Sequence, residues 1–169
     1  MAKNPDPRIT PYLLYEDVDA ALQWLDAAFG LKPFGDTFKG ADGKTNHAAM
    51  KLGDGAVMMG YPGPDYRNPR KLGGVTQNLY IRVKGVDAHF ERAKAAGAKI
   101  LEELAETFYG HRRYGAEDPE GHVWYFAESI KKKKKKEKER KKSKRDKKGK
   151  KDKKGKKGKP KGSTKKTRT

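Results

Sequence analysis

Four histidines have the widest chemical range of any side chains in this sequence: His47, His89, His111 and His122. Imidazole can act as an acid, a base or a metal ligand near neutral pH. His89 lies in the middle of a predicted helix, where a surface or boundary position is expected. His111 and His122 belong to a predicted hairpin, and no nucleophile stands at a catalytic spacing from them. Hydrogen bonds that organise the turn are therefore preferred there, whereas His47 begins a strand and its direction stays open.

Nucleophilic and nucleotide chemistry have little support in the sequence. The chain has no Cys, which excludes disulfides, zinc-thiolate sites and a Cys nucleophile. Serine occurs only at Ser129, Ser143 and Ser163, at or beyond the end of the predicted domain, so no Ser-His-acid triad is expected. Neither a dinucleotide-binding fingerprint nor a Walker motif is present.

Aromatic side chains on predicted strands favour a different function, the binding of a small organic molecule. Because side chains alternate along a strand, five residues are expected to share one concave face: Thr10, Tyr12, Asn78, Tyr80 and Tyr125. Arg112 and Arg113 adjoin this face, where one of them would meet an anionic or carbonyl group through a forked hydrogen bond. The alternatives are core packing for the aromatic residues and an ion pair with Glu117 or Asp118 for the arginine.

The elements that must position these residues follow the hydrophobic pattern. A strand at 10–15 is followed by a helix that Asp17 caps and Gly30 ends, and then by strands near 33–39, 46–52 and 55–61. The order then restarts with a strand at 77–83, a helix from Val86 to Gly97, and strands near 98–106, 111–117 and 121–128.

An offset of 68 residues aligns the two halves and places Tyr12 on Tyr80. Two copies of one β-α-β-β-β unit explain this order most simply. The fold class is therefore predicted as α+β. The expected divisions are an N-terminal arm at 1–7, a first module at 8–61, an inter-module loop at 62–74, a second module at 75–130 and a disordered Lys-rich tail at 131–169.

Two local motifs carry a resemblance to a known family. The first is the strand and helix of residues 83–97, and the second is the hairpin with Tyr109-Gly-His-Arg112 and Asp118-Pro-Glu-Gly-His-Val-Trp124. Over residues 8–128 the chain resembles the vicinal oxygen chelate superfamily, which includes glyoxalase I, bleomycin-resistance proteins and extradiol dioxygenases. The resemblance implies eight strands that form an open cleft with helices outside. It also implies a homodimer, because many members dimerise and some complete the cleft across the dimer.

Metal-dependent members of that family place a His on the first strand of each module and a carboxylate on the last. The matching positions here are Thr10, Asn78, Met59 and Tyr125, and none of them is His, Asp or Glu. Such a set suits a divalent metal poorly, so no cofactor is predicted. A rearranged metal site that uses His47, Glu120 or His122 is the alternative, although strand alternation turns His122 away from the cleft.

The charge of the chain is concentrated at one end. The formal net charge is +19, but residues 131–169 hold 25 Lys and Arg against 4 Asp and Glu, a net charge of +21. This segment lacks large apolar residues, so it cannot offset the entropy of folding by burial. It begins with Lys131, Lys132, Lys133, Lys134, Lys135 and Lys136. These residues are expected to contact nucleic acid or another polyanion without sequence preference, unless the tail only solubilises the protein.

Two absences guide the expected location. No apolar run approaches the ~18–20 residues of a membrane span, and the first residues lack the apolar core of a signal peptide. The sequence therefore predicts a cytoplasmic protein without membrane insertion, with nucleoid association as a further expectation if the tail binds DNA.

Together these features predict a glyoxalase/bleomycin-resistance-like domain that binds a small organic molecule in an aromatic cleft without the usual metal. The predicted ligand-binding residues are Thr10, Tyr12, Met59, Asn78, Tyr80, Arg112 and Tyr125. One alternative is an enzyme of the lyase, isomerase or dioxygenase type with a rearranged metal site, and the sequence leaves open whether any reaction is catalysed. The other is a nucleic-acid- or polyanion-associated protein that acts through its tail.

Overall fold

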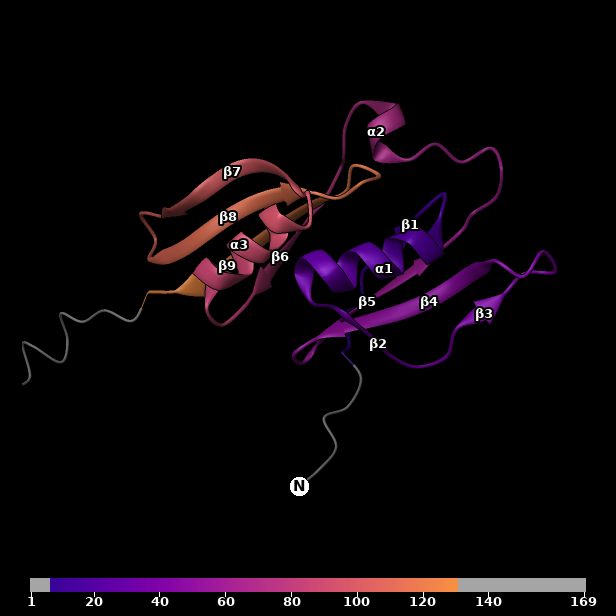
Figure 1. The fold of residues 1–169 in the computed structure, drawn as a ribbon, viewed down its shortest axis with the longest axis horizontal. Coiled ribbons are helices and arrows are strands. Elements are labelled where there is room, and N and C mark those ends of the chain that lie inside the picture. Colours follow the sequence, from indigo (N-terminus) through magenta and orange to yellow (C-terminus); the bar gives the residue numbers. More distant parts are fainter. Residues whose placement is uncertain (1–6, 131–169) are drawn as a thin grey trace, which may run out of the picture. The chain divides into compact units, whose positions relative to one another are not determined.

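The computed structural model describes residues 7–130, and the first module occupies its N-terminal half (Figure 1). Strand β1 (Tyr12–Leu14) leads into helix α1 (Val18–Phe29). The remaining strands of this module are β2 (Lys32–Pro33), β3 (Phe38–Lys39), β4 (Thr45–Leu52) and β5 (Gly55–Gly60). The predicted strand at 33–39 is thus divided in two, because the chain turns at Gly35, whose φ is 69°.

The second module repeats this order after a connecting loop. Within the loop, a short helix α2 (Pro69–Leu72) begins where the sequence led us to expect no regular structure. Strand β6 (Asn78–Arg82) and helix α3 (Val86–Ala95) follow, and then strands β7 (Lys99–Glu106), β8 (His111–Glu117) and β9 (Val123–Ser129). The predicted α+β class and the duplicated unit are confirmed.

The strands form two separate open sheets, one for each module. The first has the order β1-β5-β4-β2, with β3 also paired to β4, and the second has the order β6-β9-β8-β7. In both sheets the first strand lies parallel to the last, so that Tyr12 is opposite Met58 and Tyr80 is opposite Tyr125. The eight-stranded surface expected from the sequence is therefore divided between two sheets within one chain.

Helix α1 shows how local sequence sets the boundaries of an element. The side chain of Asp17 accepts a hydrogen bond of 2.9 Å from the Ala20 amide, and Gly30 ends the helix with a φ of 72°. Val18, Leu25 and Phe29 form its buried face. The predicted cap, helix and stop are all confirmed.

Both modules contribute to a single hydrophobic core. Leu13, Met50 and Met59 from the first module are buried in the same cluster as Trp124 and Phe126 from the second. Helices α1 and α3 contact each other. Because side chains alternate on a strand, the residues between these core positions lie on the opposite, helix-free face of each sheet.

The compact unit that holds both modules ends at Ile130. The predicted polyanion-binding lysines, Lys131 to Lys136, and the predicted disorder of the tail lie outside the described residues. Most of the predicted N-terminal arm also lies outside them. In the part of the chain that is described, no helix is long and apolar enough to cross a membrane.

Candidate functional site

The helix-free face of the first sheet, which we call the first open face, carries an aromatic hollow. Its exposed side chains include Tyr12 on β1, Phe38 on β3 and Met58 on β5. A cavity of about 370 Å³ lies on this face, lined by residues that include Thr10, Phe38, His47 and Met58. A volume of this order falls within the usual range of small-molecule pockets.

Tyr12 and His47 form a hydrogen-bonded pair on the first open face. The Tyr12 hydroxyl lies 2.7 Å from Nδ1 of His47, and the two rings stack with their centroids 5.6 Å apart. If the phenol donates to Nδ1, the neutral imidazole carries its proton on Nε2. The pair then offers a donor to a ligand oxygen beside an aromatic surface.

The helix-free face of the second sheet, the second open face, repeats the same pairing. The Tyr80 hydroxyl lies 2.6 Å from Nδ1 of His111, and the ring of Tyr109 packs edge-on against His111. Burial raises the pKa of Tyr80 above its usual value, which keeps the hydroxyl protonated and able to donate. Each open face thus carries one Tyr–His pair.

A second group on this face surrounds Tyr125. The Tyr125 hydroxyl donates a hydrogen bond of 2.9 Å to the Glu102 carboxylate, and this bond is the main cause that raises the pKa of the phenol. The Arg113 guanidinium lies 4.6 Å from the centre of the Tyr125 ring and also pairs with Glu102. A cation, a carboxylate and an aromatic face therefore lie together at this position.

The structure brings some of the predicted ligand-binding residues together and separates others. Tyr80 and Tyr125 are neighbours on the second open face, and Asn78 lies on the same strand two residues from Tyr80. Thr10 and Tyr12 belong to the first module. Within residues 7–130, no hydrogen bond or ring contact connects Tyr12 with Tyr80 or Tyr125, so the predicted residues fall into two groups, one on each open face.

Met59 does not belong to the open face where the sequence placed it. Its side chain is fully buried in the core, and Met58 faces outward opposite Tyr12. The prediction counted four residues onward from Gly55 and from Gly121 in the two hairpin turns. The paired strands show that the equivalent of Tyr125 is Met58, so the two hairpins differ by one residue in register. Because one residue of slip reverses the face of a strand, the prediction of Met59 is corrected to Met58.

Arg112 is likewise directed away from the second open face. Its Nε lies 3.1 Å from both carboxylate oxygens of Asp87, and its NH2 lies 2.8 Å from Oδ1. This pairing lowers the pKa of Asp87. The expected alternative partners, Glu117 and Asp118, bond elsewhere. Arg113, at the next position, carries a positive charge on the open face. It stands two residues from His111 on β8, so both side chains share one face, and this spacing was the sequence signal that could have identified Arg113.

The residues at the family's metal-ligand positions do not fit a divalent metal. Thr10, Asn78 and Tyr125 offer a hydroxyl, an amide and a phenol, and the fourth position offers a thioether. Among residues 7–130, no group of three or more His, Asp and Glu side chains converges as a metal site would require.

Two candidates for a rearranged metal site, Glu120 and His122, instead hold the modules together. The Glu120 carboxylate accepts hydrogen bonds of 2.8 and 2.9 Å from the Glu16 and Asp17 amides. His122 Nε2 lies 2.9 Å from the Leu14 carbonyl oxygen. These three bonds connect the β8–β9 turn with the turn from β1 into α1, so the His122 side chain, expected to organise its own hairpin, bonds the neighbouring module instead.

Comparison with known sequences places this fold in a family. The profile of the glyoxalase/bleomycin resistance protein/dioxygenase superfamily matches residues 8–126. The chain belongs to this superfamily. An uncharacterised protein of Mycobacterium bovis is 32% identical over 136 residues, which cover 78% of this chain and 89% of that protein. The predicted family is confirmed.

Solved structures of the superfamily share the fold. TioX from Micromonospora sp. ML1 is 33% identical, with a TM-score of 0.60 over 73% of this chain and 99% of its own. The genomically encoded fosfomycin resistance protein FosX from Listeria monocytogenes is 12% identical, with a TM-score of 0.55 over 74% of this chain and 94% of its own. The latter likeness establishes the fold alone.

Proposed function

We propose that this superfamily member binds a small, largely planar organic molecule on its open faces without the family's usual metal. The observation that carries the proposal is the Tyr–His pair that each open face repeats, Tyr12 with His47 and Tyr80 with His111. Each pair combines an aromatic surface with a hydrogen-bond donor. A ligand ring would stack on the aromatic side chains, and a ligand oxygen would accept from imidazole.

The proposed active form is a homodimer. Side chains such as Tyr12, Phe38, Tyr80 and Tyr109 are between 43% and 58% exposed on the open faces of one chain. A partner that joins a first open face to a second open face would cover this apolar surface and complete the two half-sites. Covering exposed apolar area is favourable by about 25 cal/mol per Å².

Arg113, Glu102 and Tyr125 would set the preference of the second half-site. The guanidinium is held by both the carboxylate and the ring, so it is ordered before a ligand arrives. A ligand that carries a carbonyl or weakly anionic group beside its ring would accept a hydrogen bond there. The proposal is for binding, because within residues 7–130 each imidazole of the open faces already bonds a tyrosine hydroxyl.

Native mass spectrometry of freshly purified protein tests the state and content of the site together. A dimer mass that retains an organic ligand and no stoichiometric metal is the expected result.

Titration with neutral 7-hydroxycoumarin tests the aromatic surface of the open faces. Tyr12→Ala and Tyr125→Ala should each weaken coumarin binding roughly tenfold through lost stacking, while Tyr61→Ala serves as the exposed aromatic control. Stoichiometric Fe, Mn, Ni, Zn or Co that His47→Ala removes would overturn the metal-free proposal, and unchanged coumarin affinity in folded variants would overturn the site.

The Lys-rich tail supports a second function that is compatible with the first. Residues 131–169 carry a net charge of +21, whereas residues 1–130 carry −2. A segment of such charge is expected to bind polyphosphate through the release of counterions. We therefore also propose sequence-independent association with nucleic acid or another polyanion.

A further inference from the structure

The turn between β7 and β8 carries two exposed aromatic rings, Phe108 and Tyr109, which we call the aromatic tip. Phe108 is fully exposed, and no other large apolar side chain within residues 7–130 is exposed to the same degree. Tyr109 is 48% exposed, and the two rings meet edge to face with their centroids 5.1 Å apart. Two neighbouring rings that the fold leaves in water are typical of a contact surface.

Hydrogen bonds fix the backbone of the aromatic tip. The Thr107 hydroxyl oxygen accepts a bond of 3.0 Å from the His111 amide, and the Thr107 carbonyl oxygen accepts one of 3.0 Å from the Gly110 amide. The Tyr109 ring also packs edge-on against His111, with the centroids 5.3 Å apart. The rings are therefore presented on a formed hairpin, so the turn loses little conformational entropy when a partner binds.

The described part of the chain ends beside this turn. The Ile130 amide donates a hydrogen bond of 2.9 Å to the Gly110 carbonyl oxygen, and residues 131–169 follow Ile130 in the sequence. These residues carry a net charge of +21 but contain no Phe, Tyr or Trp. A polyanion that they attract is kept close to the aromatic tip by the covalent connection alone, which raises its effective concentration there.

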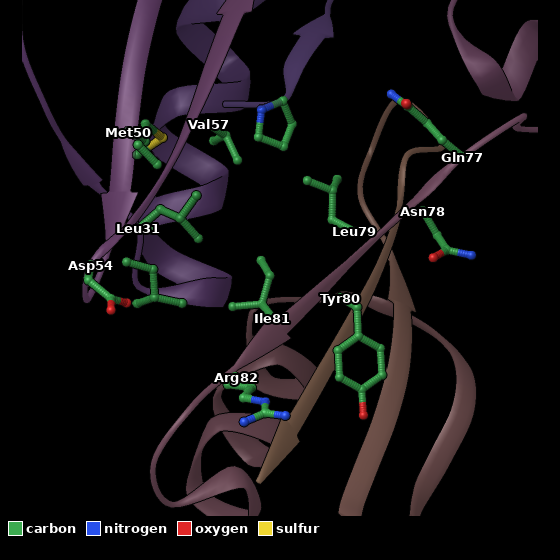
Figure 2. A pocket seen from close by; sticks show the side chains of 14 residues that line it. Leu31, Met50, Asp54, Val57, Gln77, Asn78, Leu79, Tyr80, Ile81 and Arg82 are labelled. Carbon is green, nitrogen blue, oxygen red and sulfur yellow. The ribbon is translucent and has the colours of Figure 1, made fainter. Parts of the chain in front are cut away.

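Ring contacts extend from the aromatic tip onto the second open face. Tyr109 contacts His111, and the rings of His111 and Tyr80 lie with their centroids 6.1 Å apart. Figure 2, which shows the open cavity beside β6, shows that Tyr80 points away from Leu79 and Ile81. A row of rings across a sheet suits the stacking of unpaired bases.

The charges around these rings also favour nucleic acid over an anionic membrane. By strand alternation, Arg82 shares the face of Tyr80, and Arg113 lies against Tyr125 on the same sheet. Two guanidinium groups are thus available to phosphates along the row of rings. A membrane would require an apolar edge to insert, but Glu103 and Glu106 are exposed on β7 close to the aromatic tip.

We propose that the aromatic tip is a binding site for single-stranded nucleic acid, whose unpaired bases stack on Phe108 and Tyr109. The inference rests on the polyanion function proposed for residues 131–169 and names the partner. Bases in a duplex stack on one another, so the rings add nothing to duplex binding. Lysine contacts alone favour the duplex, because its higher charge density releases more counterions. A preference for the single strand therefore reports the rings.

Fluorescence anisotropy of the full-length protein tests this preference. The probes are a labelled DNA strand of about 20 nucleotides of mixed sequence, and the same strand annealed to its complement. The single strand should bind at least as tightly as the duplex at about 100 mM NaCl. Phe108→Ala should weaken single-strand binding roughly tenfold and leave duplex binding unchanged. Tyr61→Ala, which removes an exposed ring from the first module, should change neither affinity.

Two further variants separate stacking from a merely apolar contact. Phe108→Trp should keep the single-strand affinity, and its added indole fluorescence should be quenched by the single strand but not by the duplex. Phe108→Leu keeps an apolar side chain without an aromatic face, so it should lose as much single-strand affinity as Phe108→Ala. Because Phe108 is fully exposed, all of these variants should unfold at the same temperature as the natural protein.

The possible failures can be told apart. If the full chain binds neither DNA at about 50 mM NaCl, the polyanion function fails and the stacking site fails with it. If both DNAs bind and Phe108→Ala weakens neither, only the stacking site fails. Vesicles of anionic phospholipid that bind the natural protein and Phe108→Leu, but not Phe108→Ala, would assign the aromatic tip to a membrane. A dimer that Phe108→Ala converts to monomers would assign it to a second copy of the chain.

Discussion

At the scale of single residues, His89 is a polar link between the modules. Its Nδ1 accepts a hydrogen bond of 2.7 Å from the Tyr114 hydroxyl, and its Nε2 lies 3.0 Å from the Phe29 carbonyl oxygen at the end of α1. This geometry assigns the neutral ring with its proton on Nε2. Burial lowers the pKa of His89 below its usual value. The sequence predicted a boundary position but not this contact between α3 and α1.

The depressed pKa makes the free energy of unfolding depend on pH. Unfolded His89 binds a proton near pH 6.5, about its unperturbed pKa, whereas the folded protein binds it only at lower pH. The stabilisation is therefore complete above this value and is lost as the pH falls from about 6.5 through the folded-state pKa. His89→Gln should cost roughly 1 kcal/mol at neutral pH and flatten this dependence. Urea unfolding at several pH values between about 7.5 and 5 measures it, and an unchanged slope would contradict the assignment.

At the scale of the elements, the β8–β9 turn is a clasp rather than a reactive site. Asp118 is only 1% exposed, and its carboxylate accepts hydrogen bonds from Tyr15, from Trp124 Nε1 and from the Glu120 and His122 amides. Glu120 in turn bonds the two amides that precede α1. The motif that carries the family resemblance thus explains how the second module holds the first.

Removal of the Glu120 carboxylate isolates the strength of this clasp. Glu120→Ala leaves the Glu16 and Asp17 amides without their acceptor next to the start of α1, so the free energy of unfolding should fall by about 1–2 kcal/mol. Glu103→Ala is the matched control, because Glu103 is exposed on β7 and has no hydrogen bond or ion pair within residues 7–130. Chemical denaturation of both variants checks the difference. Equal stability of the two would show that the clasp contributes nothing.

Much of the secondary structure and of its order along the chain was predictable from the sequence. The helix from Val18 to Phe29 follows local rules, since its cap and its stop are both determined by neighbouring residues. The repeated unit followed from two matching patterns of strands and helix. Met59 was misplaced because the face of a residue depends on register, and register is fixed by pairing with another strand. The pairing of Arg112 with Asp87 joins residues 25 apart in sequence, which no local pattern specifies.

The candidate site was less predictable than the fold. Alternation predicted that Tyr12, Tyr80 and Tyr125 share one concave face. The structure puts all three on helix-free faces but divides them between two sheets. The Tyr–His pairs were not predicted, because His47 and His111 come from strands whose register depends on tertiary packing. The open cavity of about 390 Å³ between the β4–β5 hairpin and β6 was also beyond the sequence, since its walls come from two modules that meet only in the folded chain.

At the scale of the whole molecule, duplication produces two similar modules with different uses of their surfaces. The β8–β9 turn bonds the first module, whereas an open cavity of about 390 Å³ lies between the β4–β5 hairpin and β6. The two open faces carry equivalent Tyr–His pairs, but only the second adds the Arg113, Glu102 and Tyr125 group. The two modules therefore share one arrangement of strands and helix but differ in the side chains that their surfaces carry.

The net charge of +19 likewise divides into parts that can be tested separately. Residues 1–130 are slightly acidic, so the tail alone should supply any affinity for polyanions. The full chain should bind a double-stranded DNA of random sequence at about 50 mM NaCl and lose at least tenfold in affinity by about 200 mM. A chain that ends at Ile130 should not bind, although its stability should be unchanged because the compact unit ends there.

Fluorescence anisotropy across a salt series measures this difference, with a scrambled DNA sequence as the control for specificity. Lysine contacts with phosphate carry no base information, so both sequences should bind equally. If the chain that ends at Ile130 bound DNA as tightly as the full chain, the affinity would belong to the folded domain. The open faces would then have to accommodate bases by stacking. A salt-independent affinity would also contradict the charge mechanism, because counterion release requires that added salt weaken the complex.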